Sequence, residues 1–306
     1  MDNVETLFFS GGAMKCIVIL GCMKYLFEKN IIKPNFEGIK DIYFISGSSI
    51  YLTPLLMGFS LESTIELFKK MDYKKLSGIE DIKIQNFFEN YGFKKITDYR
   101  YIMEVILKSK NISPDITLKE FSDMVDINIH FRVTNINKCC NEYINNHNSP
   151  DLKYIDAILM TSCIPILFEP IEYNGCLYID GGINNNFPYE KVIDKKNYLG
   201  IDIISSCISS SKQYEKKEIN TLSDYMNIVC NLYGSPPIIK SNINHIQIFI
   251  DGHGINYERF SKNMKETLLL GYNTCKDHFS NFQKHNCLEL HLNEGQKDDE
   301  NVEKQA

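Results

Sequence analysis

Three serines stand close together in the stretch FISGSSIY, directly after an apolar run that is typical of a buried strand. A serine at a sharp turn between a strand and a helix exposes its hydroxyl near the positive end of the helix dipole, where developing negative charge is stabilised. Gly47 and Ser49 match a G-x-S-x-G nucleophile elbow, with Tyr51 in place of the final glycine. The sequence therefore makes Ser49 a candidate nucleophile; a helix N-cap without catalytic role is the alternative.

A second candidate feature is the glycine turn SGGAMK, which covers residues 10–15. Such a turn can present consecutive backbone N–H groups to an anion, either a phosphate or the oxyanion of an acyl-transfer intermediate. It matches neither G-x-G-x-x-G nor G-x-x-x-x-G-K-[ST], so nucleotide binding is not indicated. A plain tight turn is the other interpretation.

The third feature is Asp180 in YIDGGINNNFP, at the end of an apolar strand and directly before two glycines. Open α/β folds place catalytic groups at such strand ends. An ordinary Asp-Gly turn is the common alternative. Only a partnership with Ser49 would make Asp180 a general base.

Other chemistries find no support in the residue pattern. The ten cysteines form no CxxC pair and no zinc-ligand spacing with histidine, so no metal or cofactor is expected. His130 falls on the polar face of the alternating run INIHFRV and is expected to face solvent. With 33 Lys and Arg against 39 Asp and Glu, the net charge of -6 and the lack of a dense basic run argue against nucleic acid as a partner.

The sequence also carries no targeting signal. The acidic N-terminus lacks a basic region before its apolar residues, and no apolar run approaches the roughly 18 residues that span a bilayer. We therefore expect a cytoplasmic protein that is neither secreted nor membrane-spanning, in keeping with cysteines that lie mostly in apolar segments.

The elements that must position these residues alternate along the chain. Two units of strand, glycine turn and helix open the sequence, at residues 5–26 and 42–57. This order predicts an α/β fold, a three-layer α/β/α arrangement with a mainly parallel central sheet. Helices are further predicted after the N-caps Ser60 and Thr117, the latter with a Glu120 capping box. The remaining expectations are helices at 151–163 and 261–279 and strands at 127–133, 176–182, 198–204 and 245–251.

A single domain is expected over residues 5–292. Within it, the polar and aromatic segment 76–113 is predicted to form a helical insertion or lid, and the serine-rich segment 205–218 a mobile loop. The polar tail 293–306 is predicted to be disordered.

Taken in chain order, GGAMKC, GSSIY and DGG resemble the three motifs of the patatin-like phospholipase family: a glycine-rich oxyanion loop, a G-x-S-x-[GA] elbow and a D-G-[GA] motif. The stretch TSCIPILFEPIEYNGCLYIDGGINNNFP is similar to the family's segment around its catalytic Asp. The resemblance covers most of the chain, from about Glu5 to Phe279, and is closest to bacterial and large-virus members.

The resemblance implies a function and a set of residues. It implies a lipid acyl hydrolase that cleaves carboxylic esters of phospholipids or neutral lipids through an acyl-enzyme and a Ser-Asp dyad, with Ser49 as nucleophile and Asp180 as base. It further implies peripheral membrane contact and no cofactor. The other residues that it assigns are the oxyanion-hole residues Gly11, Gly12, Ala13 and Met14, the basic Lys15, and the supporting glycines Gly47, Gly181 and Gly182.

Two departures from the family pattern carry expectations. Ala13 replaces the third glycine of the oxyanion loop, which requires that Ala13 avoid a positive φ. Tyr51 replaces the glycine that lets the nucleophile helix pack closely on a neighbouring strand.

Two other functions remain open from the sequence. One is an α/β-hydrolase with a Ser-Asp-His triad, for which His253 in the turn DGHG is the best-placed histidine. The other is a catalytically impaired family member that binds lipid or a protein partner through the same pocket, an interpretation that Tyr51 favours.

Overall fold

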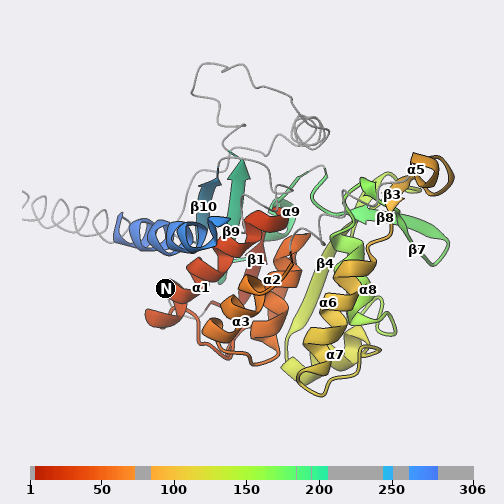
Figure 1. The fold of residues 1–306 in the computed structure, drawn as a ribbon. Helices are drawn as coiled ribbons and strands as arrows, with labels where there is room; N and C mark the ends of the chain where they lie inside the picture. Colours follow the sequence, from red (N-terminus) through yellow and green to blue (C-terminus); the bar gives the residue numbers. More distant parts are fainter. Residues whose placement is uncertain are drawn as a thin grey trace, which may run out of the picture.

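The computed structural model describes residues 4–72, 84–183, 185–193, 195–205, 244–250 and 262–281. An eight-stranded sheet forms the centre of this part of the chain (Figure 1). Its strands are β1 (Thr6–Phe9), β2 (Asp41–Phe44), β4 (Asn128–Asn135), β5 (Cys140–Asn145), β7 (Ile171–Tyr173), β8 (Cys176–Asp180), β9 (Tyr198–Ser205) and β10 (His245–Ile250).

The order of the strands is β10-β9-β1-β2-β4-β8-β7, and β5 also pairs with β4. Neighbours from β10 to β4 are parallel, whereas β5, β7 and β8 join in antiparallel pairs. The predicted α/β class with a mainly parallel central sheet is therefore confirmed.

Helices cover the sheet and carry the loops around the site. They are η1 (Ala13–Cys16), α1 (Ile17–Glu28), α2 (Gly47–Leu56), α3 (Leu61–Lys69), α5 (Ile84–Asn90), α6 (Thr97–Lys108), α7 (Leu118–Val125), α8 (Tyr154–Thr161), α9 (Tyr189–Val192) and a helix over residues 264–281. A separate two-stranded sheet joins β3 (Gly92–Lys94) to β6 (Ile166–Phe168). The N-cap at Ser60 and the capping box of Thr117 and Glu120 are confirmed.

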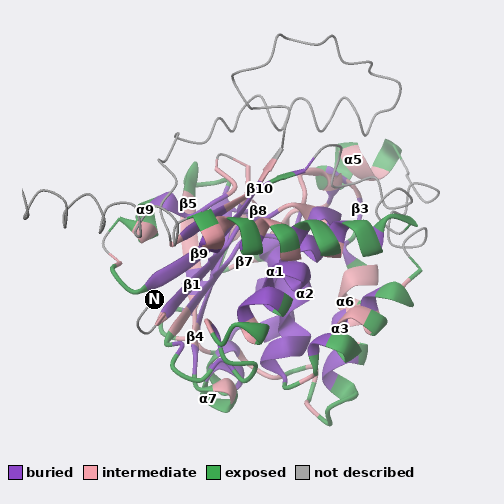
Figure 2. Ribbon diagram, turned by 90° about the vertical axis from the view of Figure 1, so that its left-hand side faces the viewer, coloured by how far each residue is buried: buried purple, intermediate pink, exposed green. Residues whose placement is uncertain are grey.

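The two faces of the sheet are packed differently because side chains alternate along each strand. Leu7 and Phe9 of β1 belong to the large core cluster that includes residues of α1, α2 and α8. Phe8 of β1 points the other way, where it stacks on Tyr43 and joins a small aromatic cluster with Tyr189 of α9. Figure 2 shows the buried residues concentrated in the strands and in α1 and α2.

The predicted C-terminal helix is present as residues 264–281 and packs on α1. A Cβ atom on Gly21 would lie 2.0 Å from the carbonyl oxygen of Leu268, and one on Gly271 would lie 2.1 Å from that of Val18. The two helix backbones touch at these glycines, so residues far apart in the sequence form one layer beside β1.

The expectation that His130 faces solvent is wrong. Its side chain is buried, stacks on Tyr43 with ring centroids 4.2 Å apart, and places Nε2 3.0 Å from Oδ1 of Asp41. His130 lies opposite Tyr43 of β2 and Asn145 of β5 in the sheet register. The Tyr43 ring covers the imidazole on this face, Tyr143 packs against Tyr43, and the Asn145 side chain lies 3.3 Å from Nδ1 of His130.

Other sequence-based boundaries stay predictions. The described part of the predicted insertion 76–113 contains α5, β3 and α6. The predicted domain limits at residues 5 and 292 are not tested by the structure and stay predictions. The predicted loop from residue 206 onward and the tail 293–306 lie outside the described residues. In the described part of the chain, no helix combines the length and hydrophobicity needed to cross a membrane.

Candidate active site

A sharp turn at Ser46 joins β2 to α2. Ser46 has φ 54° and ψ −134°, a backbone conformation that residues other than glycine rarely adopt and that is often found at functional sites. Because α2 begins at the next residue, Ser46 stands at the N-terminus of the helix. Its hydroxyl donates a 2.6 Å hydrogen bond to Oδ2 of Asp180, 134 residues further along the chain.

The strand register explains why Ser46 and Asp180 meet. Phe44 of β2 lies opposite Phe131 of β4, so the chain two residues beyond Phe44 is level with Val133. Val133 is in turn opposite Asp180 on β8. β8 runs antiparallel to β4, so Asp180 approaches the end of β2 from the opposite direction rather than from a parallel strand end.

Ser49 does not occupy the turn, and the expectation that its exposed hydroxyl partners Asp180 is wrong. Ser49 is completely buried in the first turn of α2, where its hydroxyl donates to the carbonyl oxygen of Ser46 at 2.7 Å. The physical reason is that β2 ends at Phe44, which puts the turn three residues earlier than the sequence motif does.

This shift also changes the meaning of Tyr51. The residue two positions after Ser46 is Ser48, which is small and buried and bonds through its hydroxyl to the backbone of Ile45. A small side chain therefore does occupy the closely packed position of the elbow. Tyr51 lies almost one helical turn further on.

Burial raises the pKa of Asp180 to about 6, while the hydrogen bonds from Ser46 and from the Gly182 N–H, together with the charge of Arg132, act in the opposite direction. The Gly182 N–H donates to Oδ1 at 2.7 Å and fixes the carboxylate. A carboxylate with a pKa near neutrality is a stronger base than one in water, yet it is still largely ionised at pH 7.

Two threonines hold this arrangement, and the sequence analysis did not single them out. Thr161 accepts a hydrogen bond from the Ser46 N–H at 2.9 Å and donates to the carbonyl oxygen of Arg132 at 2.6 Å. Thr134 donates to the carbonyl oxygen of Asp180 at 2.9 Å. The only sequence signal for Thr161 was its place in the stretch TSCIPILFEP that resembles the family.

Three glycines permit close backbone approach around the pair. A Cβ atom on Gly47 would lie 2.7 Å from the Ala13 carbonyl oxygen, and one on Gly181 would lie 2.1 Å from that of Arg132. On Gly11 it would lie 3.0 Å from the Ser46 Cβ. The glycine turn therefore lies directly against the elbow.

One of the four predicted oxyanion-hole residues has its N–H engaged elsewhere. The Gly11 N–H donates to the carbonyl oxygen of Asn186 at 3.2 Å, and the Asn186 side chain donates back to the Gly11 carbonyl oxygen at 2.7 Å. The amide of Gly11 is thus not available to an oxyanion in this conformation. Asn186 instead fixes the turn against the segment that follows Asp180.

Gly12, Ala13 and Met14 remain as candidates for the oxyanion hole. Within the described ranges, the N–H groups of Gly12 and Ala13 have no acceptor, and they stand at the start of η1, which continues into α1. Ala13 has φ 48°, so the expectation that it avoids a positive φ is wrong. Lys15 is buried in η1.

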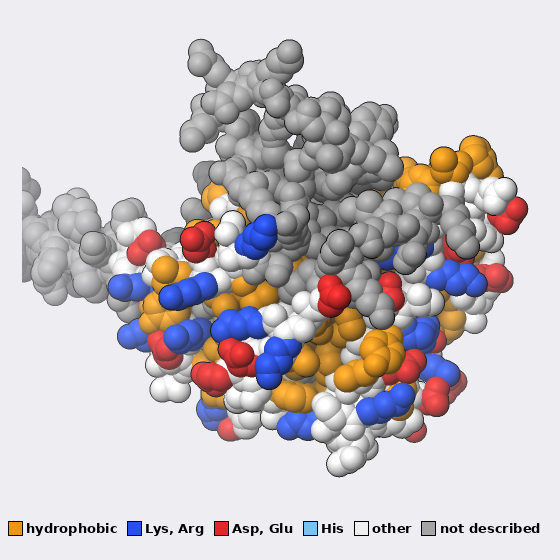
Figure 3. Space-filling view, in the orientation of Figure 1, with side chains coloured by type: hydrophobic (Ala, Val, Ile, Leu, Met, Phe, Trp, Pro, Cys, Tyr) orange, Lys and Arg blue, Asp and Glu red, His pale blue; other side chains and the backbone are white. Residues whose placement is uncertain are grey.

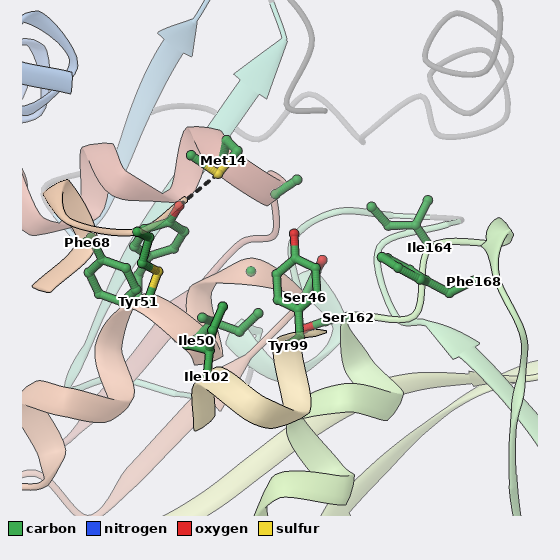
Figure 4. Close-up of a pocket in the computed structure, with 13 residues that line it drawn as sticks. Met14, Ser46, Ile50, Tyr51, Phe68, Tyr99, Ile102, Ser162, Ile164 and Phe168 are labelled. Carbon is green, nitrogen blue, oxygen red and sulfur yellow. Dashed lines mark hydrogen bonds between the residues drawn. The ribbon is translucent and has the colours of Figure 1, made fainter. Parts of the chain in front are cut away.

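An apolar pocket opens beside Ser46, lined mostly by hydrophobic side chains. Such a lining suits a hydrophobic ligand such as an acyl chain. Figure 4 shows Ser46 between two groups of apolar side chains. The lining residues are Ala13, Met14, Ser46, Gly47, Ile50, Tyr51, Phe68, Met71, Tyr99, Ile102, Ser162, Ile164 and Phe168.

Ser162 is a second serine in the pocket wall. Its Oγ is buried and has no hydrogen-bond partner among the described residues. Buried hydroxyls are nearly always bonded, so an unpaired Oγ at this position is unusual.

The described residues bear on the metal expectation in part and leave the triad alternative untested. Among the residues that the structure describes, no three His, Cys, Asp or Glu side chains gather as a metal site. His253, the histidine of the alternative triad, lies outside the described residues.

A serine bonded to a buried carboxylate, at a strand-to-helix turn beside an apolar pocket, is typical of serine hydrolases that act on lipid esters. The patatin-like phospholipase family profile matches residues 7–193. The chain belongs to this family, as its motifs predicted, and is thus a lipid hydrolase of the esterase or phospholipase class.

Two viral proteins are similar in sequence. The probable lipid hydrolase 463L of Invertebrate iridescent virus 6 is 29% identical over 260 residues, which cover 81% of this chain and 86% of that protein. The uncharacterised protein R571 of Acanthamoeba polyphaga mimivirus is 25% identical over 187 residues, 61% of each chain.

Two solved structures share the fold. VipD from Legionella pneumophila has a TM-score of 0.60 at 16% identity, covering 91% of this chain and 67% of that one. The type III effector protein ExoU of Pseudomonas aeruginosa has a TM-score of 0.50 at 13% identity, covering 91% and 53%. These similarities confirm the fold alone.

Proposed function

We propose that the chain cleaves carboxylic esters of phospholipids or neutral lipids through a Ser46–Asp180 dyad and an acyl-enzyme intermediate. The observation that carries the proposal is the 2.6 Å hydrogen bond from Ser46 Oγ to Asp180 Oδ2, beside an apolar pocket. Ser46 takes the nucleophile role that the motif had given to Ser49, because Ser49 is buried and bonded to the backbone.

The first half of the reaction uses the buried carboxylate as a base. Asp180 accepts the Ser46 proton as Oγ attacks the ester carbonyl carbon. Negative charge develops on the carbonyl oxygen and is stabilised by the N–H groups of Gly12 and Ala13 and by the N-termini of η1 and α2. Asp180 then returns the proton to the alcohol oxygen, which leaves as a lysophospholipid or a partial glyceride.

The second half releases the fatty acid. A water molecule attacks the acyl carbon on Ser46 while Asp180 takes its proton, and the tetrahedral intermediate collapses with the proton returning to Ser46 Oγ. The raised pKa of Asp180 suits both directions of proton transfer near neutral pH.

A fluorophosphonate probe tests the nucleophile directly. The probe should form an adduct that mass spectrometry maps to Ser46 in the wild-type protein and that is lost in Ser46→Ala. Ser49→Ala is the matched control, since it removes a hydroxyl three residues away in the same helix, and it should still be labelled. Release of fatty acid from phosphatidylcholine or triacylglycerol should follow the same pattern.

Two outcomes would overturn the proposal. Labelling at Ser49 would restore the nucleophile that the motif indicated. A folded wild-type protein that neither reacts with the probe nor releases fatty acid would leave lipid or partner binding as the better account.

We further propose that the protein contacts membranes peripherally through α5, since lipid substrates reside in bilayers. Ile84 and Phe88 are 67% and 76% exposed and lie four residues apart, on one side of the helix. Tyr91, directly after the end of α5, is 66% exposed. Hydrophobic side chains are visible at this end of the molecule in Figure 3. With a net charge of -6, apolar contact is better supported than attachment to anionic lipid.

The link between α5 and the pocket supports this orientation. Phe87 of α5 stacks on Phe93 of β3, and β3 pairs with β6, whose Phe168 lines the pocket. Gly92 lies so close to β6 that a Cβ atom on it would be 2.3 Å from the Glu169 nitrogen. A bilayer bound at α5 would therefore lie next to a wall of the pocket.

Sedimentation with phosphatidylcholine vesicles tests the membrane contact. Phe88→Ser should weaken vesicle binding several-fold because it removes apolar area from the interface. Met124→Ser, at an exposed position of α7, is the control and should bind like wild type. If Phe88→Ser and Met124→Ser bound vesicles equally well, α5 would not be the membrane-contacting element.

A further inference from the structure

Apolar side chains line the pocket on two sides of Ser46, and the exposure of Ile164 distinguishes one side from the other. Met14, Tyr51 and Phe68 are almost completely buried, and we call these three residues the closed end. On the other side of Ser46, Ile164 is partly exposed, whereas Phe168 beside it is buried (Figure 4). In Figure 4 the closed end and the Ile164 side lie on opposite sides of Ser46.

Tyr51 is held firmly within the closed end. Its hydroxyl donates to the sulfur of Met14 at 3.1 Å, and its ring packs on Phe68 with centroids 4.4 Å apart and an angle of 43° between the rings. These contacts join η1, α2 and α3, so the ring is fixed from three elements. A ring fixed in this way cannot swing aside without breaking contacts in all of them.

Helix geometry determines the distance between Ser46 and the Tyr51 ring along α2. Tyr51 is five residues beyond Ser46, which corresponds to a rise of about 7.5 Å along an α-helix. An acyl chain bound with its carbonyl at Ser46 and its tail directed inward therefore meets the Tyr51 ring before the hydrocarbon reaches the core.

We propose that Tyr51, with Met14 and Phe68, limits the length of the acyl chain that the pocket accepts, and so selects esters of shorter fatty acids over longer ones. The proposal rests on the proposed function, because it assumes that the acyl group enters this pocket from Ser46. It makes Tyr51 a specificity-determining residue whose aromatic ring is the essential part.

The experiment compares kcat/KM for nitrophenyl esters of saturated acids from butanoate to palmitate. In Tyr51→Leu, the ratio of kcat/KM for the palmitate ester to that for the butanoate ester should rise by on the order of 10-fold or more, as expected when a pocket gains room for further methylenes. Tyr51→Phe keeps the ring and should keep the wild-type ratio.

Two further variants control for folding and for nonspecific loosening of the pocket. Phe68→Leu opens the closed end from α3 and should shift the ratio in the same direction, which keeps the test valid if Tyr51→Leu does not fold. Ile164→Ala removes apolar volume on the partly exposed side and should leave the ratio unchanged.

The outcomes separate this proposal from the proposed function. An unchanged ratio in folded Tyr51→Leu and Phe68→Leu, or an equal shift in Ile164→Ala, would overturn the role of Tyr51 while leaving the hydrolase intact. If wild type hydrolyses no ester, the proposed function fails; displacement of a fluorescent fatty acid by saturated acids of increasing length then tests the closed end by itself. Tyr51→Leu should bind the longer acids more tightly, and no difference between the variants would overturn the proposal.

Discussion

Two aspartates at opposite ends of the same stretch of sheet differ in what surrounds them. Asp41 begins β2 and is bonded to His130 at 3.0 Å, with the Lys195 ammonium 3.4 Å from its other oxygen. Asp180 ends β8 and is bonded to the Ser46 hydroxyl and a backbone N–H.

The surroundings move the two carboxyl pKa values in opposite directions. The hydrogen bond from His130 is the largest influence that lowers the pKa of Asp41, aided by the charges of His130 and Lys195. Burial raises the pKa of Asp180 to about 6. A carboxylate with close cationic partners supports the fold, whereas a buried carboxylate with a hydroxyl partner is ready to accept a proton.

The largest expected effect comes from replacing each aspartate by asparagine, which should separate the structural role of Asp41 from the catalytic role of Asp180. Asp180→Asn removes the base and should lower kcat/KM by on the order of 10³- to 10⁴-fold. Asp41→Asn should retain activity within a few-fold of wild type. Ester hydrolysis measured beside circular dichroism checks both, and an active, folded Asp180→Asn would refute the base assignment.

The pH dependence of catalysis should follow Asp180 alone. A base must be deprotonated to act, so kcat/KM should rise about tenfold per pH unit below an apparent pKa of about 6 and level off above it. Asp41→Asn should show the same profile. A profile that stays flat from pH 5 to 8, with chemistry rate-limiting, would contradict a general base with this pKa.

Removing a hydroxyl beside the site should have a smaller effect on catalysis. Thr161→Val breaks the bonds to the Ser46 N–H and the Arg132 carbonyl, and should cost about 10- to 100-fold in kcat/KM because the elbow loses its fixed position. Thr53→Val is the control, since Thr53 is buried in α2 and bonds to the Ser49 carbonyl. Both should lose about 1–3 kcal/mol of stability, and equal losses of activity would show that Thr161 has no special role.

The smallest expected effects are on thermal stability, where the contributions of Asp41 and Asp180 depend on pH in opposite directions. Because the pKa of Asp41 is lowered on folding, its ionised form stabilises the protein above the ordinary pKa of an aspartate, and this contribution is lost as the pH falls through the lowered folded value. Asp41→Asn should therefore lower Tm at pH 7, by an amount that shrinks as the pH falls below about 4.

The contribution of Asp180 to stability has the opposite pH dependence. Its pKa is raised on folding, so its contribution to stability is fully present below the ordinary pKa and is lost as the pH rises to about 6. Asp180→Asn should accordingly show no loss of Tm at pH 7. Thermal melts of Asp41→Asn and Asp180→Asn at several pH values check both predictions. If the Tm of both variants changed with pH in the same direction relative to wild type, the two carboxylates would not differ in the way proposed.

Much of the fold and part of the site could be predicted from local sequence. The capping box at Thr117, the strand that ends at Asp180 and the glycine turn at Gly11 depend on neighbours a few residues away, so the chain specifies them directly. The family followed from the order of three such motifs. His130 was misplaced because its burial depends on β5 and Tyr43, which no local alternation pattern reports.

The sequence by itself determined that a serine would stand at the head of the helix after the second strand, and it pointed to Ser49. It also placed Asp180 at the end of a strand. Only the tertiary structure decided that the serine is Ser46, because what distinguishes it from Ser49 is a positive φ at the end of β2 and a carboxylate brought in by the β4–β8 register. The pocket was likewise decided by packing, since Tyr51, Phe68 and Tyr99 come from three helices whose spacing no short motif encodes. Local patterns fix local backbone, whereas the partner of a hydroxyl depends on contacts between segments far apart in the chain.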